Sequence, residues 1–373
     1  MRDIVESTRS FEAWMRKRTD ISKRLLKKKH RKMAEGAFPF LRATFYRWTE
    51  QWPKVCPQLA KRDDDVLLVV GDLHVENFGV WRDSRERLVW GINDFDEACE
   101  LPFTSDLVRL AVSVLLAGEA AKISTTATRV CALLLDGYRA GLRAGGSPIV
   151  VSKRYPALAT LTEHTEEDLA TFWKKKLDPT DNPVVNARDL PEGLEAMFHA
   201  SFAPHTHPVF RIQKSPGGLG SLGRRRYTAV VDVNRGARVA REAKALVPSA
   251  LYWYLGRNQM RSQTGTLLQH AVRVPDPHFQ VHDSWLLREL APDIAKIEMP
   301  DNNADKRLVL APNLLRLMGR ETANIHLGSR SPERLARSLT QLDRNTEWFP
   351  TATDRMAACT RDDQAQWAKH RVD

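Results

Sequence analysis

The sequence predicts an α+β protein with two lobes, one mainly helical and one rich in strands. Apolar residues at helical spacing dominate both ends of the chain, as in "SDLVRLAVSVLLAGEAA" (105–121) and "APNLLRLMGRETANIHL" (311–327). Strand-like runs surround a glycine-rich turn at 209–244. A length of 373 residues is enough for two lobes with a sizeable core.

We expect residues 1–205 to form the helical lobe, residues 206–300 the strand-rich lobe, and 301–373 the C-terminal helices that complete the helical lobe. Residues 8–52 have helical patterns that break at Gly36. Other predicted elements are a strand–turn–strand unit at 77–94, a helix at 128–142, a connector at 145–208 with one helix at 165–177, and a strand at 284–290 that links the lobes.

Composition indicates a cytoplasmic protein with an anionic ligand. The chain has 57 Lys and Arg against 46 Asp and Glu, a net charge of +11, with a local excess in "KRLLKKKHRKM" (23–33). A solvated helix face is the simplest interpretation of that segment, and the absence of interleaved aromatic residues argues against nucleic acid as a partner. No apolar run reaches the roughly 20 residues that span a bilayer. Four scattered cysteines argue against structural zinc and a disulfide framework.

Two polar motifs, each at the end of a strand-like run, contain the candidate catalytic and metal-binding residues. "GDLHVEN" (71–77) has the spacing D-x-x-x-x-N in Asp72 and Asn77, and "INDFDEA" (92–98) adds Asp94 after a predicted hairpin. In phosphoryl transfer one carboxylate orients the attacking hydroxyl, while an Asn and a second carboxylate hold magnesium on the phosphates. We therefore predict Asp72 as a catalytic residue, and Asn77 and Asp94 as ligands of Mg²⁺.

Each of these residues also has an ordinary structural interpretation. Asp72 and Asn77 could complete a turn or cap a helix. His74 could position Asp72 or be a core histidine with satisfied hydrogen bonds, and we take it as a second catalytic residue. A metallophosphoesterase, which also begins with D-x-H, would need further metal ligands downstream that the sequence lacks after residue 97.

Three neighbouring carboxylates favour structural roles. Asp96 and Glu97 are typical of exposed turn carboxylates. Asp106 lies at the start of a predicted helix, where capping is its expected role, and Thr104 or Ser105 could also cap this helix.

A glycine-rich turn supplies the candidate phosphate-binding loop. "GGLGSLGRRRY" (217–227) contains Gly218, Gly220 and Gly223 in the pattern G-x-G-x-x-G, with Ser221 between them. Glycines let backbone N–H groups approach phosphate oxygens. Strands on both sides argue against a dinucleotide-binding turn, which a helix would follow. The loop could also be a plain flexible hairpin.

The strand after this loop offers two cations. Lys244 lies on one face with Ala240 and Glu242, whereas Arg241 lies on the other. Either could bind phosphate, and Lys244 could equally be a surface lysine. In a kinase the glycine loop and its lysine precede the catalytic loop, but here they follow it. The motifs therefore predict a kinase-like fold in circularly permuted order.

Five segments of the chain also resemble the bacterial domain of unknown function 2252 family, in matching order. They are "RKMAEGAFPFLRATFYRW" (31–48), "GDLHVENFGVW" (71–81), "INDFDEACELPFTSDLVRLAVSV" (92–114), "GGLGSLGRRRY" (217–227) and "REAKALVPSA" (241–250). The resemblance implies a permuted protein-kinase-like fold related to aminoglycoside phosphotransferases. It implies catalysis by Asp72, magnesium on Asn77 and Asp94, and a bracing role for Asp106. Arg241 stands where family members often have lysine.

The expected function is ATP- and magnesium-dependent transfer of a phosphoryl group to a hydroxyl of a small molecule. The loop residues Gly218, Gly220, Ser221 and Gly223, with Arg241 or Lys244, would bind the nucleotide. Two alternatives stay open: transfer of the nucleotidyl group on the same fold, and a non-catalytic nucleotide-binding or scaffold protein on a degenerate kinase fold.

Overall fold

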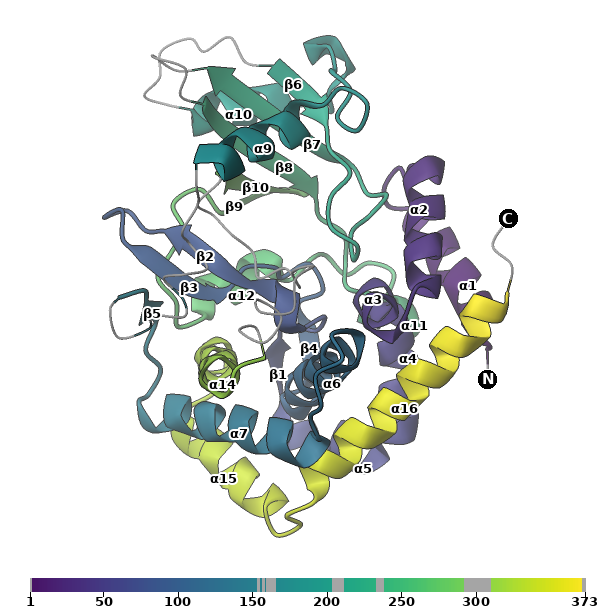
Figure 1. Cartoon of the computed structure of the whole chain (residues 1–373), viewed down its shortest axis with the longest axis vertical. Helices are drawn as coiled ribbons and strands as arrows, with labels where there is room; N and C mark the ends of the chain where they lie inside the picture. The colour runs from purple at the N-terminus through teal and green to yellow at the C-terminus, as the bar shows by residue number, and fades with distance from the viewer. Residues whose placement is uncertain are drawn as a thin grey trace.

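The computed structural model describes residues 2–152, 155, 158, 166–202, 211–232, 238–291 and 310–370. Its fold is mixed α and β, with most helices in the lower part of Figure 1 and the largest sheet in the upper part. The helices are α1 (Ile4–Arg16), α2 (Lys23–Ala34), α3 (Ala37–Ala43), α4 (Phe45–Val55), α5 (Pro57–Ala60), α6 (Thr104–Ala120), α7 (Ala127–Arg143), α9 (Glu166–Leu177), α10 (Leu194–Ser201), α11 (Ala250–Tyr254), α12 (Thr264–His270), α14 (Pro312–His326), α15 (Pro332–Leu342) and α16 (Trp348–Lys369).

The strands of the described residues form three sheets. They are β1 (Val66–Val69) with β4 (Cys99–Pro102); β2 (Phe78–Arg82), β3 (Leu88–Ile92) and β5 (Ile149–Val150); and β6 (Arg211–Lys214), β7 (Arg226–Asp232), β8 (Arg238–Ala245), β10 (Trp285–Leu290) and β9 (Gln280–His282) in that order. Every neighbouring pair is antiparallel. Short turns η1 (Asp63–Asp65), η2 (Val75–Asn77) and η3 (Ala187–Asp189) complete the described elements.

The largest sheet confirms the predicted strands on both sides of the glycine-rich turn. β6 and β7 pair from Arg211 opposite Val230 to Lys214 opposite Tyr227, and the turn joins them. The predicted strand at 284–290 is present as β10, between β8 and β9. Its expected link to the helical lobe runs into residues 292–309, which lie outside the described residues.

The two hydrophobic cores divide the chain differently from the predicted lobes. The smaller core joins one face of the large sheet to α10, where Leu194, Phe198 and Phe202 recur at helical spacing. We assigned α10 to the connector of the helical lobe, because a helix of two turns leaves a weak periodic signal. The larger core conversely takes in Trp253 of α11 and Leu267 of α12, from the predicted strand-rich segment. The boundaries at 205/206 and 300/301 fall outside the described residues.

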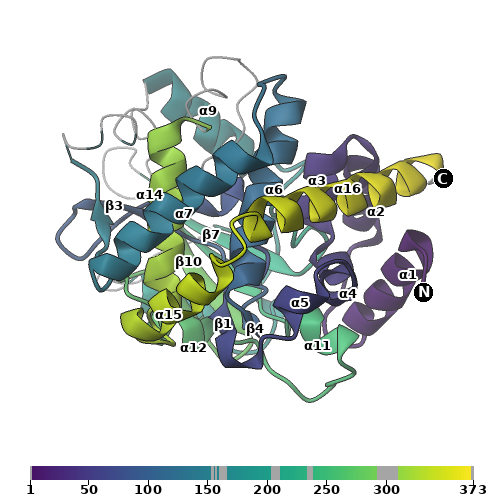
Figure 2. The same ribbon diagram turned by 90° about the horizontal axis from the view of Figure 1, so that it is seen from below.

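Helices from both ends of the chain pack together in the larger core. Figure 1 and Figure 2 show α16 running beside α6 and reaching the N-terminal helices α1 and α2, so that the two termini lie on the same side of the molecule. Buried Arg47 of α4 ties these ends together, because its Nε and Nη2 donate to the two oxygens of Asp363 on α16 at 2.7 and 2.8 Å. No helix in the described ranges is both long and apolar enough to cross a membrane.

Helices α7 and α14 approach each other through glycines. A Cβ on Gly137 would lie 1.9 Å from the carbonyl oxygen of Arg316, and one on Gly319 would lie 2.0 Å from that of Leu134. Backbone atoms cannot give way as a flexible side chain can, so these positions require glycine despite its cost in a helix.

We predict that Gly137→Ala destabilises the protein by about 1–3 kcal/mol, although alanine is the better helix former, because its methyl group forces the two helices apart. Urea unfolding would measure the loss. Gly265→Ala in α12 is the matched control, since its Cβ would meet the nearest atom at an ordinary 3.6 Å. Equal stability of both variants would contradict this packing.

Candidate active site

A polar pocket of about 900 Å³ brings together segments that are far apart in the sequence. Both polar motifs and the glycine-rich loop line it, as do residues of the N-terminal helices. Of the predicted site residues, the lining includes Asp72, His74, Asn77, Asp94, Gly218, Gly220 and Ser221. The pocket thus brings both polar motifs and the glycine-rich loop together.

The end of β1 is held in place by Asp106 of α6. Its carboxylate accepts hydrogen bonds from the backbone N–H groups of Val70 and Gly71 at 2.8 and 2.9 Å. His326 of α14 lies 3.2 Å from the same carboxylate, and Tyr138 lies 2.9 Å from the other nitrogen of that ring. Helix α6 has no side-chain cap, so the capping role expected for Asp106, Thr104 or Ser105 is wrong. The carboxylate instead braces the strand end, as the family resemblance implied.

Gly71 is one of the positions where only glycine fits. Its φ is +82°, and a Cβ there would lie 2.3 Å from the carbonyl oxygen of Glu97. The chain turns sharply at this point, which places Asp72 at the pocket and the two polar motifs side by side.

A backbone hydrogen bond joins the two motifs directly. The N–H of Asn93 donates to the carbonyl oxygen of Asn77 at 2.9 Å, next to the hairpin pairing of Phe78 with Ile92. The Asn77 side chain also shapes its own loop, since its Oδ1 accepts from the N–H of His74 at 2.6 Å. Asp94 therefore lies on the strand end adjacent to Asn77.

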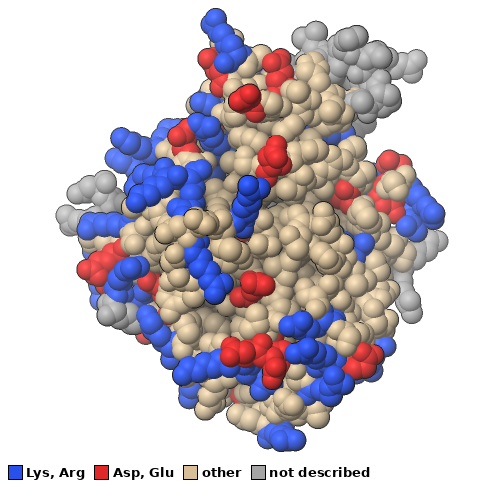
Figure 3. Space-filling view, turned by 180° about the vertical axis from the view of Figure 1, so that it is seen from behind, with Lys and Arg blue, Asp and Glu red and all other residues tan. Residues whose placement is uncertain are grey.

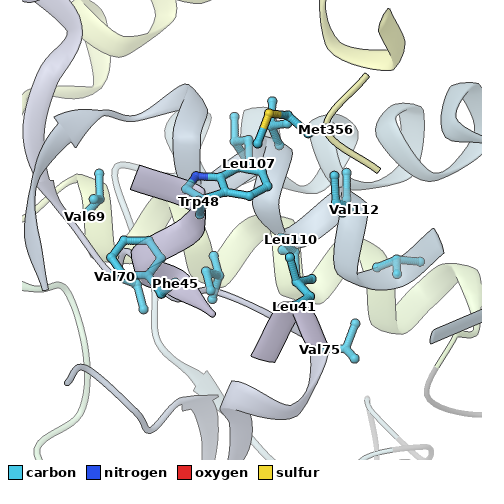
Figure 4. Close-up of a cluster of buried hydrophobic side chains, with 14 of the residues drawn as sticks. Leu41, Phe45, Trp48, Val69, Val70, Val75, Leu107, Leu110, Val112 and Met356 are labelled. Carbon is cyan, nitrogen blue, oxygen red and sulfur yellow. The ribbon is translucent and has the colours of Figure 1, made fainter. Parts of the chain in front are cut away.

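Asp72 is paired with an arginine that the sequence did not single out. Arg109 of α6 is fully buried, and its Nε donates to Asp72 Oδ1 at 3.0 Å, with a second bond from Nη2. The guanidinium lies over the rings of Phe45 and Trp48, at 5.1 and 4.9 Å from their centroids. Figure 4 shows both rings on α4 in the buried cluster that also contains Leu107 and Leu110 of α6. Arg109 follows Asp106 by three positions, so one helix face carries both groups that hold this motif.

The environment of Asp72 suits a proton acceptor near neutral pH. Burial raises the pKa of this carboxyl to about 7, although Arg109 opposes the shift. Its second oxygen, Oδ2, lies beside the glycine-rich loop, since a Cβ on Gly220 would be 3.5 Å from it. His74 is buried at the pocket wall, and its Nδ1 accepts from the N–H of Glu76 at 3.2 Å.

The structure distinguishes the two candidate cations of β8. Lys244 is buried, and its ammonium nitrogen lies 3.3 Å from Asp94 Oδ1 and 2.6 Å from Asp96 Oδ1. Arg241 points to the opposite face of the sheet, where it pairs with Glu289 at 2.7 Å and lies over the ring of Phe202. The alternation of side chains along a strand separates them. The sequence also allowed Arg241 to bind phosphate, but Arg241 lies on the face of the sheet away from Asp94 and Asp96.

Glu97 is buried and Asp96 is partly buried, with a side chain that is 10% exposed, so the prediction that they are exposed turn residues is wrong. Arg224, from the glycine-rich segment, pairs with Asp96 at 3.5 Å and with Glu97 at 3.0 Å. Glu97 also accepts from the N–H of Ala250 at 2.7 Å. These contacts attach the glycine-rich segment to the second motif.

The glycine-rich loop covers the pocket from the side of the large sheet. Ser221 Oγ accepts from Arg226 at 2.7 Å, which anchors the loop to β7. Gly223 has a φ of +102°, and its carbonyl oxygen accepts from the N–H of Ser22 at 3.0 Å, just before α2. Gly223 is therefore not part of the pocket lining, and it instead attaches the loop to the segment before α2.

The oxygen donors suit a magnesium ion only if phosphate oxygens complete its shell. Asp94 and Asn77 both line the pocket, and each offers the oxygen type that Mg²⁺ prefers. No group of three or more His, Cys, Asp or Glu side chains in the described part of the chain could hold a metal. A metal here would depend on a nucleotide that brings most of its ligands.

Comparison with known proteins supports the family resemblance over part of the chain. Residues 21–182 match the family described as "Uncharacterized protein conserved in bacteria (DUF2252)". This range contains both polar motifs, Asp106 and Arg109, whereas the glycine-rich loop lies beyond it. No curated protein and no solved structure matches the chain significantly.

We predict that Asp106→Asn costs about 1–3 kcal/mol of stability, because an amide accepts through one oxygen and leaves a buried backbone N–H of the β1 end unpaired. Chemical denaturation would measure this. The matched control is Asp136→Asn on α7, whose half-exposed carboxylate pairs with Arg316; an exposed ion pair contributes about 0–1 kcal/mol. A loss no greater than that of the control would contradict the bracing role.

Proposed function

We propose that the protein is a phosphotransferase that moves the terminal phosphoryl group of ATP, with Mg²⁺, to a hydroxyl of a small molecule. The observation that carries this proposal is the meeting of Asp72, Asn77 and Asp94 with the glycine-rich loop in one pocket. These groups supply the parts that phosphoryl transfer needs: a base, oxygen donors for a metal, and backbone N–H groups for phosphates.

Asp72 is the proposed base. Its Oδ1 is held by Arg109, which leaves Oδ2 on the side of the glycine-rich loop to accept the proton of the acceptor hydroxyl. A carboxyl with a pKa of about 7 is matched to proton transfer near neutral pH. The buried guanidinium fixes the orientation of the carboxylate, because the rings of Phe45 and Trp48 enclose it.

Lys244 is the proposed phosphate-binding cation. It approaches the pocket from β8, and Asp94 and Asp96 hold its ammonium group beside the second motif. Asp94 and Asn77 would hold Mg²⁺, which when bound neutralises charge on the phosphate oxygens. Backbone N–H groups of Gly218, Gly220 and Ser221 would receive the phosphates.

The proposed architecture is a protein-kinase-like fold in permuted order. The antiparallel sheet that carries the glycine-rich loop and Lys244 packs over the motif of Asp72 and Asn77, yet follows it in the chain. Chain order does not affect a mechanism that depends on geometry. The contact of Lys244 with Asp94, which are 150 positions apart, supports this arrangement.

The test of function is mass spectrometry of a mixture of hydroxyl-bearing metabolites incubated with the protein, ATP and Mg²⁺. We expect a product that gains a phosphoryl group, and no product with Asp72→Asn. A product that gains AMP would replace phosphoryl transfer with nucleotidyl transfer, and absence of ATP binding would refute both.

We predict that Mg²⁺ raises the affinity of the wild-type protein for ATP about tenfold or more and has a much smaller effect in Asp94→Asn, because the variant loses a charged metal ligand. Calorimetry with and without Mg²⁺ would measure this. Asp96→Asn is the matched control: it removes the same charge beside the same lysine and should keep the magnesium effect. Equal enhancement in Asp94→Asn and the wild type would exclude Asp94 as a ligand.

We predict that Gly220→Val weakens ATP binding about tenfold or more without unfolding the protein, because the side chain fills the space where phosphates would approach the loop. A Cβ at Gly220 would already lie 3.3 Å from the carbonyl oxygen of Arg42. Gly265→Val on α12, outside the pocket lining, is the control, since its Cβ would meet the nearest atom at an ordinary 3.6 Å. A lower melting temperature with normal ATP affinity would indicate that the loop is a structural hairpin.

A further inference from the structure

A buried lysine of α2 lines the pocket. Lys29 of α2 is 9% exposed, and its ammonium group donates to the carbonyl oxygen of Gly220 at 3.2 Å. No carboxylate forms an ion pair with it in the described part of the chain. A buried ammonium group without an anionic partner is costly, so its position in a pocket calls for a ligand that supplies the charge.

Lys29 differs from the other basic residues of its helix. The remaining Lys and Arg side chains of α2 are exposed: Lys23, Arg24, Lys27, Lys28, Arg31 and Lys32. They contribute to the basic side chains on the flank of the molecule where α2 lies, at the left in Figure 3. Lys29 lies on the same helix face as Leu26 and Met33, which are buried at three- and four-residue spacing. The basic run thus combines a solvated face with one lysine directed inward.

Arg224 is a second positive charge near Lys29. Burial, and after it the charge of Arg224, lowers the pKa of Lys29 to about 8, although the carboxylates of Glu12, Glu97 and Asp72 oppose this shift.

Arg42 also lines the pocket. Its Nη2 pairs with Glu76, whereas its Nε is buried without a hydrogen-bond partner among the described residues. An anion at this point would give Lys29 a direct charged partner and satisfy the open Nε donor of Arg42.

Lys29 lies on the same side of the pocket as Asp72, the proposed base. Gly220, whose carbonyl oxygen contacts Lys29, also lies beside Asp72 Oδ2, since a Cβ on Gly220 would be 3.5 Å from that oxygen. Lys244, the proposed cation for the nucleotide, lies instead with Asp94 and Asp96. The two lysines therefore lie beside different groups, Lys29 beside the proposed base and Lys244 beside the proposed metal ligand Asp94.

We propose that Lys29, with Arg42 and Arg224, forms an anion-binding subsite for the acceptor, which would be a hydroxyl compound that carries a phosphate or carboxylate group. The assignment to the acceptor rests on the proposed function, whereas the subsite itself does not. Lys29 would bind the anionic group and so orient the hydroxyl toward Asp72.

The test is calorimetric binding of inorganic phosphate to the full chain, without nucleotide and with saturating ATP. We expect saturable binding to the wild type in both conditions, a loss of about tenfold or more in Lys29→Gln, and affinity within about twofold of the wild type in Lys28→Gln. Lys28 is the neighbouring exposed lysine of the same helix. ATP affinity should be the same in Lys29→Gln as in the wild type.

A second measurement on the wild type keeps the test independent of how the variant folds. Phosphate should protect Lys29, and not Lys28, from an amine-acetylating reagent, as read by mass spectrometry of peptides. Equal phosphate binding by wild type and Lys29→Gln, or no protection of Lys29, would overturn the subsite. Displacement of phosphate by ATP would overturn its assignment to the acceptor. Phosphate binding without any ATP binding would refute the proposed function and leave the subsite standing.

Discussion

The pocket depends on a single buried carboxylate. Asp106 accepts from two successive backbone N–H groups at the end of β1 and meets the imidazole of His326 from the other side. A strand end in the interior has no water to satisfy its polar groups, so a side chain must do so. Through this contact α6, α14 and β1 share one junction, and the sharp turn at Gly71 directs Asp72 away from it into the pocket.

Charge pairing then organises the pocket in the absence of a ligand. Arg109 holds Asp72, Arg224 holds Asp96 and Glu97, and Lys244 joins the second motif to the large sheet. Such buried ion pairs fix the geometry of the pocket more than they add to the net stability of the fold. They join the large sheet to the helical part through contacts between sequence-distant segments. Lys29 differs, since among the described residues no carboxylate forms an ion pair with it and its ammonium group donates to the carbonyl oxygen of Gly220.

Much of the fold and of the site could be predicted from local patterns. The hairpin of β2 and β3, the strands around the glycine-rich turn, and the long helices α6, α7, α14 and α16 follow from the length and spacing of their apolar runs. Helix α10 was missed, since two turns carry too few apolar positions. Arg109 was missed as well, although its three-residue spacing from Asp106 could have indicated a shared helix face.

The sequence by itself determined the types of chemical group and their local spacing. Asp72 and Asn77 had to share one loop, and the alternation along β8 had to separate Lys244 from Arg241, because strand geometry places neighbours on opposite faces. Only the tertiary structure decided which partners those groups meet. Asp106 braces a strand end and does not cap α6, Glu97 and the partly buried Asp96 pair with Arg224, and a lysine in a basic run faces the pocket. These outcomes depend on contacts between residues up to 220 positions apart, as between Asp106 and His326, and no local pattern encodes such distances.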